Sequence, residues 1–318
     1  MRKTYPQVWP AYNSAQTNEK DYFQALLFDL CRIVPDAPQR KGRPRMPLSD
    51  AVFSMTFKVY TNLSARRFMS DLRAAHTRGY ISKVPHFNSV LNYLEEPGLL
   101  PILTDLITMS SLPLKGLEEQ FACDSTGFGS SRFIRWYDEV HGDTKSRQHD
   151  WLKAHIMCGT RTNIVTAVVI GDRNSADGPR LPPLLAATAE NFNVAEVSAD
   201  KAYSTRANLE AIAAQGAQGF VPFKSNTTGK IGGLWEKAFH YFSLHREEFL
   251  QHYHRRSNVE ATFSMIKRKF GDSIRSRSDA AMINEVLCKI LAHNISCVVQ
   301  SVYEFGVDPS FTTHGTTA

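Results

Sequence analysis

The sequence predicts an α/β protein in which a mixed five-stranded sheet is flanked by helices and preceded by an all-α N-terminal region. Two observations predict this fold class. Apolar residues recur at helical spacing through roughly the first 115 residues, and from Gln120 onward the chain changes to short β-like runs, the later of which alternate with helical segments. Consecutive strands followed by strand–helix alternation are typical of a mixed sheet with helices on its faces.

The N-terminal region contains several segments with the apolar spacing of amphipathic helices. They span residues 23–34, 48–63, 64–75, 87–96 and 99–111. Ser49, Ser64 and Asn88 stand near the starts of three of these segments, and we expect them to be N-caps, because short polar side chains accept hydrogen bonds from the free N–H groups of the first turn. Proline in the basic segment between the first two helices prevents one continuous helix.

The second part of the chain contains the expected strands. They are FACDSTGF (121–128), KAHIMCG (153–159), NIVTAVVIG (163–171), NVAEVSAD (193–200) and GFVPFK (219–224). Helical segments at 182–190 and 205–215 separate the later strands. We expect a long basic helix from about 245 to 270 and an amphipathic helix from about 278 to 303 to complete this part.

Composition limits the classes of partner. The 318 residues are 42% hydrophobic, enough for a buried core, and carry a net charge of +6 that favours polyanionic partners. Residues 251–277 contain seven Lys or Arg against two acids, so much of the positive excess lies in one segment. The five cysteines form no CxxC pair, so we expect neither a zinc knuckle nor a disulfide framework.

The chain shows no targeting or membrane-spanning pattern. Its first residues, MRKTYPQVWPAYNSAQ, lack the apolar core of a signal peptide. No apolar run approaches the ~18 residues of a membrane span. We therefore expect a soluble, cytoplasmic protein that does not associate with a membrane.

The most informative stretch is YHRRSNVEATFSMIK, residues 253–267. Tyr253, Arg256, Glu260 and Lys267 are spaced three, four and seven residues apart, which puts all four on one helical face. A carboxylate flanked by a phenol, a guanidinium and an ammonium suits a site that holds a metal ion beside a phosphodiester. The expected substrate is therefore a nucleic acid backbone.

This stretch resembles the Tyr–Arg–Glu–Lys signature of bacterial and archaeal insertion-sequence DDE transposases, members of the ribonuclease-H-like (retroviral integrase) superfamily. All four positions match, and the resemblance covers roughly residues 120–294. It implies a ribonuclease-H-like fold and a DNA transposase that cleaves phosphodiesters at transposon ends by a two-metal-ion mechanism and transfers the strand into target DNA. It assigns the catalytic, metal-binding acids to Asp124, Asp200 and Glu260.

The positions of the acids agree with this chemistry. Asp124 and Asp200 each stand near the carboxyl end of a predicted strand, and carboxylates that bind metal ions for phosphoryl transfer must converge from separate elements. Taken singly, each Asp is more often a turn former or a helix cap, and Glu260 could simply pair with Arg256. The remaining acids of this region are interpreted, from loop composition, as surface residues: Asp172, Asp177, Glu190 and Glu196.

The resemblance also implies a cofactor and partners. All-oxygen ligands favour Mg²⁺, with Mn²⁺ as a possible substitute. Double-stranded DNA, as inverted-repeat ends and as target, is the implied substrate, and a homodimer in the DNA complex is carried over from the family. We expect five side chains to bind phosphates, with a solvated basic helix face as the alternative: Tyr253, Arg256, Lys267, Arg268 and Lys269.

Two N-terminal features also suggest contacts with DNA. RKGRPR, residues 40–45, resembles the minor-groove-binding core of AT hooks, although a basic loop between helices is at least as good an interpretation. Segments 64–72 and 86–93 could form a helix-turn-helix, but ordinary bundle packing is favoured because the intervening RGYISKVPH is long.

Three further side chains of the second part have two interpretations each. Lys153 and His155 lie on the second predicted strand and could face the acids, while His155 could equally be a hydrogen-bonded sheet residue. Trp235 could stack on an unpaired base, but we favour a place in the core.

Together these inferences divide the chain into a helical DNA-binding region (1–115), a ribonuclease-H-like DDE catalytic domain (116–305) and a disordered tail (306–318). Two other functions stay open. One is a transposase-derived protein that binds DNA without catalysis, which the presence of all three acids disfavours. The other is a ribonuclease-H-like nuclease that cleaves DNA without strand transfer.

Overall fold

The structure is a computed structural model that describes residues 8–35, 45–130, 151–230 and 232–311. It divides into two compact units, one formed by Met1–Leu114 with Leu287–Ala318 and the other by Lys115–Val286. We call the first the helical unit and the second the sheet unit. Of the predicted basic segment 40–45 only Arg45 is described, where it pairs with Glu96, and residues 312–318 of the predicted tail also lie outside the described residues.

The helical unit is built around one helix that is buried on nearly all sides. Its helices are α1 (Trp9–Cys31), α2 (Leu48–Thr61), α3 (Ala65–Thr77), α4 (Phe87–Leu94), α5 (Leu99–Ser111) and the short η1 (Leu112–Leu114), together with the part of α12 (Asp279–Phe305) that begins at residue 287. Every residue of α2 from Asp50 to Val59 is buried. Such a helix forms the centre of a bundle. The predicted N-terminal all-α region is therefore confirmed.

Two of the three predicted N-caps of this unit are wrong. Ser64 occupies the N-cap of α3 as predicted, but Pro47 precedes α2 and His86 precedes α4. Proline suits the start of a helix because its ring fixes φ. The His86 ring Nδ1 accepts the Asn88 N–H at 3.3 Å and so caps α4 in place of a short polar side chain.

Contrary to the expectation from the sequence, the last helix, α12, is by length and composition apolar enough to span a membrane. The bent pair Phe87–Leu94 and Leu99–Leu114 passes the same test only when it is counted as one span. In α12, however, 89% of the apolar stretch is buried inside the protein. Asn294 of this helix donates hydrogen bonds to Ile107 O at 3.1 Å and Ser110 Oγ at 3.0 Å in α5. These features are those of a core helix.

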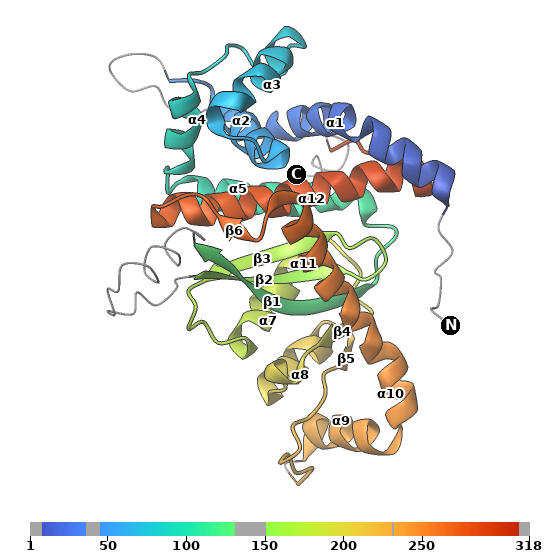
Figure 1. Ribbon diagram of the computed structural model, residues 1–318. Coiled ribbons are helices and arrows are strands. Elements are labelled where there is room, and N and C mark those ends of the chain that lie inside the picture. The colour runs from blue at the N-terminus through green and yellow to red at the C-terminus, as the bar shows by residue number, and fades with distance from the viewer. Residues whose placement is uncertain (1–7, 36–44, 131–150, 231, 312–318) are drawn as a thin grey trace, which may run out of the picture. The chain divides into compact units, whose positions relative to one another are not determined.

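The sheet unit contains a mixed sheet, as predicted (Figure 1). Its strands are β1 (Gln120–Ser130), β2 (Trp151–Gly159), β3 (Val165–Gly171), β4 (Glu196–Ala199), β5 (Gln218–Phe220) and β6 (Ser273–Ile274). The order β3-β2-β1-β4-β5 places antiparallel pairs on one side of β1 and parallel pairs on the other, as in a ribonuclease-H-like fold. The two-residue β6 pairs with the end of β1 and makes the sheet six-stranded rather than five-stranded.

Helices cover both faces of this sheet (Figure 1). The helices of the sheet unit are α7 (Leu181–Ala189), α8 (Arg206–Ala214), α9 (Gly233–Leu244), α10 (Arg246–Tyr253) and α11 (Ser257–Phe270), with the short turns η2 (Gly178–Arg180), η3 (Lys201–Tyr203) and η4 (His254–Arg256). Of these, α9 packs against α8 and α10 rather than on a face of the sheet. In α11, Thr262 Oγ1 contacts Cys158 Sγ of β2 at 3.7 Å. In α7, Thr188 Oγ1 bonds Thr166 Oγ1 of β3 at 2.8 Å. Thus α11 packs on one face and α7 on the other.

The predicted long helix over 245–270 is not continuous. It is divided into α10, η4 and α11, and a further helix, α9, precedes it. In η4 the consecutive residues Arg255 and Arg256 both reach acids of the sheet, Glu196 on β4 and Asp124 on β1. Consecutive side chains of an α-helix diverge by about 100°, so a continuous helix would not aim both at the sheet. Trp235 of α9 is buried and packs edge-on against Phe223 at 4.9 Å, consistent with the core interpretation.

Candidate active site

Two of the predicted acids stand side by side on the central strands. β1 and β4 are parallel, and their register pairs Cys123 with Ala199. Asp124 and Asp200 are the next residue on each chain, and the backbone at Asp200 is still extended, with φ −68° and ψ 161°. Neighbouring strands lie about 4.8 Å apart. The ladder therefore holds the two acids at the same level, where β4 ends.

The third acid is joined to the first by a guanidinium. Arg256 Nη1 donates to Asp124 Oδ2 at 2.9 Å, and Arg256 Nη2 pairs with Glu260 Oε1 one helical turn further on. The Arg256 and Asp124 side chains are 19% and 21% exposed. The fork of one arginine thus links β1 to α11, in an arrangement where charge-assisted bonds are strong.

The charges of the three acids act on one another. Burial raises the pKa of Asp124 above its ordinary value, and the carboxylates of Asp200 and Glu260 raise it further. The Ser125 N–H, which donates to Asp124 Oδ1 at 2.8 Å, and the Arg256 guanidinium oppose this rise. Arg256 therefore offsets part of the repulsion that Asp124 experiences from the other two acids.

Two other residues of the 253–267 stretch border the acids. The centre of the Tyr253 ring lies 5.8 Å from the Arg256 guanidinium carbon. Burial raises the Tyr253 pKa; the positive charge of Arg256 opposes this rise, and the negative charge of Asp200 adds to it. Lys267 Nζ donates to Thr126 Oγ1 at 2.7 Å and lies 5.3 Å from the Phe128 ring centre. Burial lowers the Lys267 pKa, and Asp272 opposes this.

The structure therefore brings three of the five predicted phosphate-binding residues to the acids. Thr126, the partner of Lys267, lies two residues after Asp124 and so on the same face of β1. Arg268 and Lys269 are exposed on the last turn of α11. They extend a positive surface away from the acids.

The donor set suits a hard divalent cation, although no complete ligand cage is formed. Within the described residues, no group of three or more His, Cys, Asp or Glu side chains is arranged to hold a metal ion. The acids nevertheless offer only oxygen donors, which Mg²⁺ and related ions prefer. Arg256 already places one positive group against the carboxylates of Asp124 and Glu260. A divalent ion would be attracted by the same two carboxylates.

Comparison with known families decides the identity of the sheet unit. A family model for the transposase DDE domain matches residues 115–295, which is more than half of the chain. The chain belongs to the DDE transposase family. The matched residues include Asp124, Asp200 and Glu260 and cover the whole sheet. Among curated proteins, none matches this transposase.

Membership gives the protein a function of the transposase type, with DNA as its class of substrate. Transposases of this family normally use divalent metal ions, which agrees with the all-oxygen donor set described above.

Two acids that we interpreted as surface residues are half-buried in this transposase. Asp177 accepts hydrogen bonds from Ser125 Oγ at 2.7 Å and pairs with Lys153 Nζ at 2.8 Å. Glu196 pairs with Arg255 at 2.7 Å and His252 at 3.0 Å. These partners lie on other strands and helices, so loop composition could not reveal them. Asp172 and Glu190 are exposed, as predicted.

Lys153 and His155 do not face the three acids, contrary to one prediction. His155 pairs with Ser125 in the β1–β2 register, and side chains alternate along a strand, so both residues lie on the face opposite Asp124. His155 is fully buried, and neither ring nitrogen makes a hydrogen bond to a described residue. Burial lowers its pKa to about 4. The negative charge of Asp177 opposes this decrease, and the positive charges of Lys153 and Arg180 add to it.

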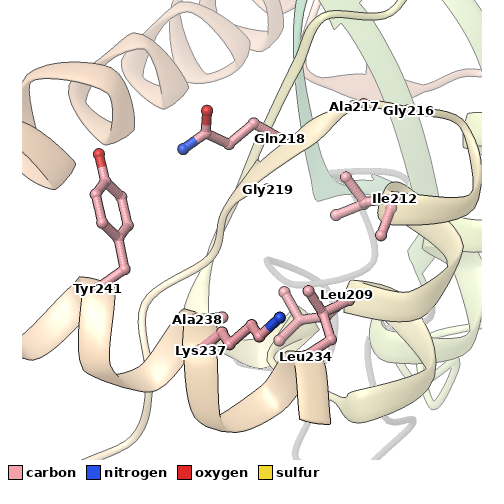
Figure 2. Close-up of a pocket in the computed structure, with 11 residues that line it drawn as sticks. Leu209, Ile212, Gly216, Ala217, Gln218, Gly219, Leu234, Lys237, Ala238 and Tyr241 are labelled. Atoms are coloured by element: carbon pink, nitrogen blue, oxygen red, sulfur yellow. The ribbon is translucent and has the colours of Figure 1, made fainter.

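A pocket of about 320 Å³ lies elsewhere in the sheet unit, between α8, α9 and the edge strand β5 (Figure 2). Its lining is mainly apolar and includes Leu209, Ile212 and Leu234, and its polar side chains are Gln218, Lys237 and Tyr241. The residues that line it include no carboxylate. This pocket is separate from the acids.

Proposed function

We propose that this protein catalyses cleavage of phosphodiester bonds at transposon ends and transfers the cleaved strand into target DNA. In this proposal Asp124, Asp200 and Glu260 are the catalytic and metal-binding acids, and Mg²⁺ is the ion, with Mn²⁺ able to substitute. The observation that carries the proposal is that Arg256 bridges Asp124 and Glu260, while the register of β1 and β4 places Asp200 beside Asp124.

The acids divide naturally into two pairs of ligands. Asp124 and Asp200, on neighbouring strands, would hold one ion, and Asp124 with Glu260, joined by Arg256, would hold a second. Divalent ions bound there supply Lewis-acid activation of water and stabilise negative charge on the phosphoryl oxygens. No organic cofactor is needed for this chemistry.

The cations around the acids position the DNA. A guanidinium fork matches two phosphate oxygens, so Arg256 can exchange its bond to the more exposed Glu260 for one to DNA while it keeps Asp124 in place. Lys267, held by Thr126 beside the acids, offers a point charge to the same backbone. Tyr253 adds a hydroxyl donor, and Arg268 and Lys269 attract the flanking phosphates.

The same proposal assigns roles to the rest of the chain. Residues 1–115 form the region that binds transposon ends, and residues 116–305 form the catalytic domain. The functional species is a homodimer on paired DNA ends in the cytoplasm. A DNA-binding protein without catalysis would gain nothing from three mutually repelling carboxylates beside DNA.

A strand-transfer assay with a pre-cleaved end tests this function. The purified chain is incubated with Mg²⁺, a target plasmid and, in separate reactions, a pre-cleaved or an uncut copy of its own flanking inverted repeat. Covalent joining of the 3′ end to the plasmid is the expected result. Cleavage of uncut ends without any joining would show a nuclease instead, and binding without either reaction would show a regulator.

A further inference from the structure

A second polar cluster lies on the face of the sheet opposite to the Asp124 side chain, next to the same part of β1. At its centre is Asp177, in the loop between β3 and η2. Asp177 Oδ1 accepts from Ser125 Oγ at 2.7 Å and from Lys153 Nζ at 2.8 Å, and His155 Nδ1 lies 3.4 Å away. Its members come from β1, β2 and the loop. Neither the metal ligands nor the phosphate-binding residues proposed above belong to it.

Ser125 connects this cluster to the first catalytic acid. Its hydroxyl bonds Asp177 on one face of the sheet, and its backbone N–H donates to Asp124 Oδ1 at 2.8 Å. Asp124 itself points to the other face, where it meets Arg256. A chain of two hydrogen bonds therefore runs from Asp177 through Ser125 to the Asp124 carboxylate.

The loop that carries Asp177 is held firmly against the strands. Lys153 Nζ also donates to Ser175 O at 3.1 Å, and Arg180 donates from Nε and Nη2 to Ser175 Oγ at 3.2 and 2.8 Å. Gly171, at the end of β3, has no space for a side chain, because a Cβ there would lie 2.4 Å from Ser175 Oγ. The loop thus packs directly on the strand ends, and Asp177 has a fixed place.

Asp177 is ionised in this position. Burial alone would raise its pKa, but hydrogen bonds from Lys153 and Ser125 outweigh burial and hold the pKa below its ordinary value. Hydrogen bonds to an ionised acceptor are shorter and stronger than those between neutral groups. An ionised Asp177 therefore restrains the Ser125 hydroxyl more tightly than a neutral acceptor would.

We propose that Asp177, with Lys153 as its counterion, is a positioning residue that orients the Asp124 carboxylate through Ser125. This inference rests on the proposed function, because it concerns the use of Asp124 as a metal ligand. Removal of a residue that hydrogen-bonds to a metal ligand, without touching the metal itself, typically lowers metal affinity or activity about 10–100-fold. The restraint matters because a carboxylate must present its oxygens to an ion at a defined angle.

The test uses three variants: Asp177→Ala, Ser125→Ala and the double variant that combines these two changes. Each is compared with a control variant, Asp172→Asn. Asp172 is exposed in the same loop and accepts the Asn174 N–H at 3.0 Å, a contact that Asn can keep, so it is a matched control. The Kd of Mn²⁺ is measured by calorimetry on the metal-free full-length protein, and kcat and KM for cleavage of end DNA are measured separately. Melting temperature reports folding.

Asp177→Ala is expected to raise the Kd of Mn²⁺ and to lower kcat, each about 10-fold or more, with KM for DNA little changed. Ser125→Ala acts through the same chain of hydrogen bonds, so the double variant is expected to be no worse than Asp177→Ala. Asp172→Asn should behave as the wild type. A folded Asp177→Ala with unchanged Kd and kcat, or losses that add fully in the double variant, would overturn the proposal.

Two further variants keep the test decisive. If Asp177→Ala does not fold, Ser125→Ala and Lys153→Gln are expected to raise the Kd of Mn²⁺, and unchanged Kd values in both would overturn the proposal. Asp124→Asn separates this inference from the proposed function. If Asp124→Asn binds Mn²⁺ as the wild type does, the assignment of Asp124 as a ligand fails first, and the positioning role fails with it.

Discussion

The guanidinium of Arg256 bonds the carboxylate of Asp124 across 2.9 Å, although 132 residues separate the two in the chain. The bond joins the turn η4 to the central strand β1, and the same guanidinium also pairs with Glu260. Through this contact a pattern that is local in the sequence, Tyr253 to Lys267, reaches an acid that is distant in the sequence. The predictions below concern that contact and its surroundings.

Replacement of Arg256 by Ala should weaken DNA binding in a salt-dependent way. If Arg256 neutralises one phosphate, the slope of log K against log salt concentration should become shallower by about 0.9. Fluorescence anisotropy over a range of salt concentrations measures the slope. Arg206→Ala is the matched control, because Arg206 also pairs with a Glu four residues later, on α8. Equal slopes for the wild type and Arg256→Ala would exclude the phosphate contact.

Asp124→Asn should raise the melting temperature at neutral pH. The pKa of Asp124 is raised in the folded protein, chiefly by burial. At neutral pH the ionised carboxylate therefore lowers the free energy of unfolding. As the pH falls through the folded pKa toward the ordinary value of 3.8, the carboxyl takes up a proton and the advantage of Asn should disappear. Melting curves at several pH values test this. A destabilised Asp124→Asn at pH 7 would contradict it.

Stability should fall in mild acid because of His155. The pKa of His155 is lowered from 6.5 to about 4 in the folded protein, so the unfolded chain binds more protons between these values. The free energy of unfolding should therefore decrease as the pH drops from about 6.5 to about 4, and this contribution is complete below that range. His155→Gln should flatten the decrease in urea denaturation experiments.

The exposed His240, which pairs with Glu236, is the control for His155. His240→Gln should leave the pH profile of the unfolding free energy nearly unchanged. The charged groups near His155 are Asp177, Lys153 and Arg180, and all three remain in the variant. A profile that is the same in His155→Gln and in the wild type would show that this histidine does not carry the acid sensitivity.

Glu118→Ala should destabilise the sheet unit by about 1–3 kcal/mol, because it removes the charged acceptor shared by three partly buried hydrogen bonds. The buried Glu118 carboxylate accepts the N–H groups of Arg161 and Thr162 and the Thr162 hydroxyl, and so holds the turn between β2 and β3. Its neighbour Glu119 is exposed, and Glu119→Ala is the control. Equal unfolding free energies for the two variants would refute the role of Glu118.

The features that depend on local patterns could be predicted from the sequence. Apolar spacing predicts most of the helices and the five main strands, although α1 begins at Trp9 rather than at residue 23 and α9 is not predicted. It also predicts strand positions for Asp124 and Asp200, because each follows an apolar run. The position of Glu260 relative to Arg256 also follows from helical spacing. These predictions use only neighbours in the chain, which is why they could be made.

The features that were missed depend on distant partners. The break at η4 arises because Arg255 and Arg256 meet acids on two different strands. Loop composition predicts a surface position for Asp177, and it cannot reveal the partner Ser125, which is 52 residues away in the chain. The two-residue β6 has too short an apolar pattern to recognise, and its pairing with β1 is defined only in the folded sheet.

Metal-dependent cleavage of end DNA by the separate variants Asp124→Asn, Asp200→Asn and Glu260→Gln tests the central claim most directly. The rate is measured with Mg²⁺ under saturating DNA, and DNA binding is measured in parallel. Each variant is expected to lose cleavage while it still binds DNA, because each removes one carboxylate of a shared site. Wild-type cleavage by any one variant would contradict the assignment of that acid to the site.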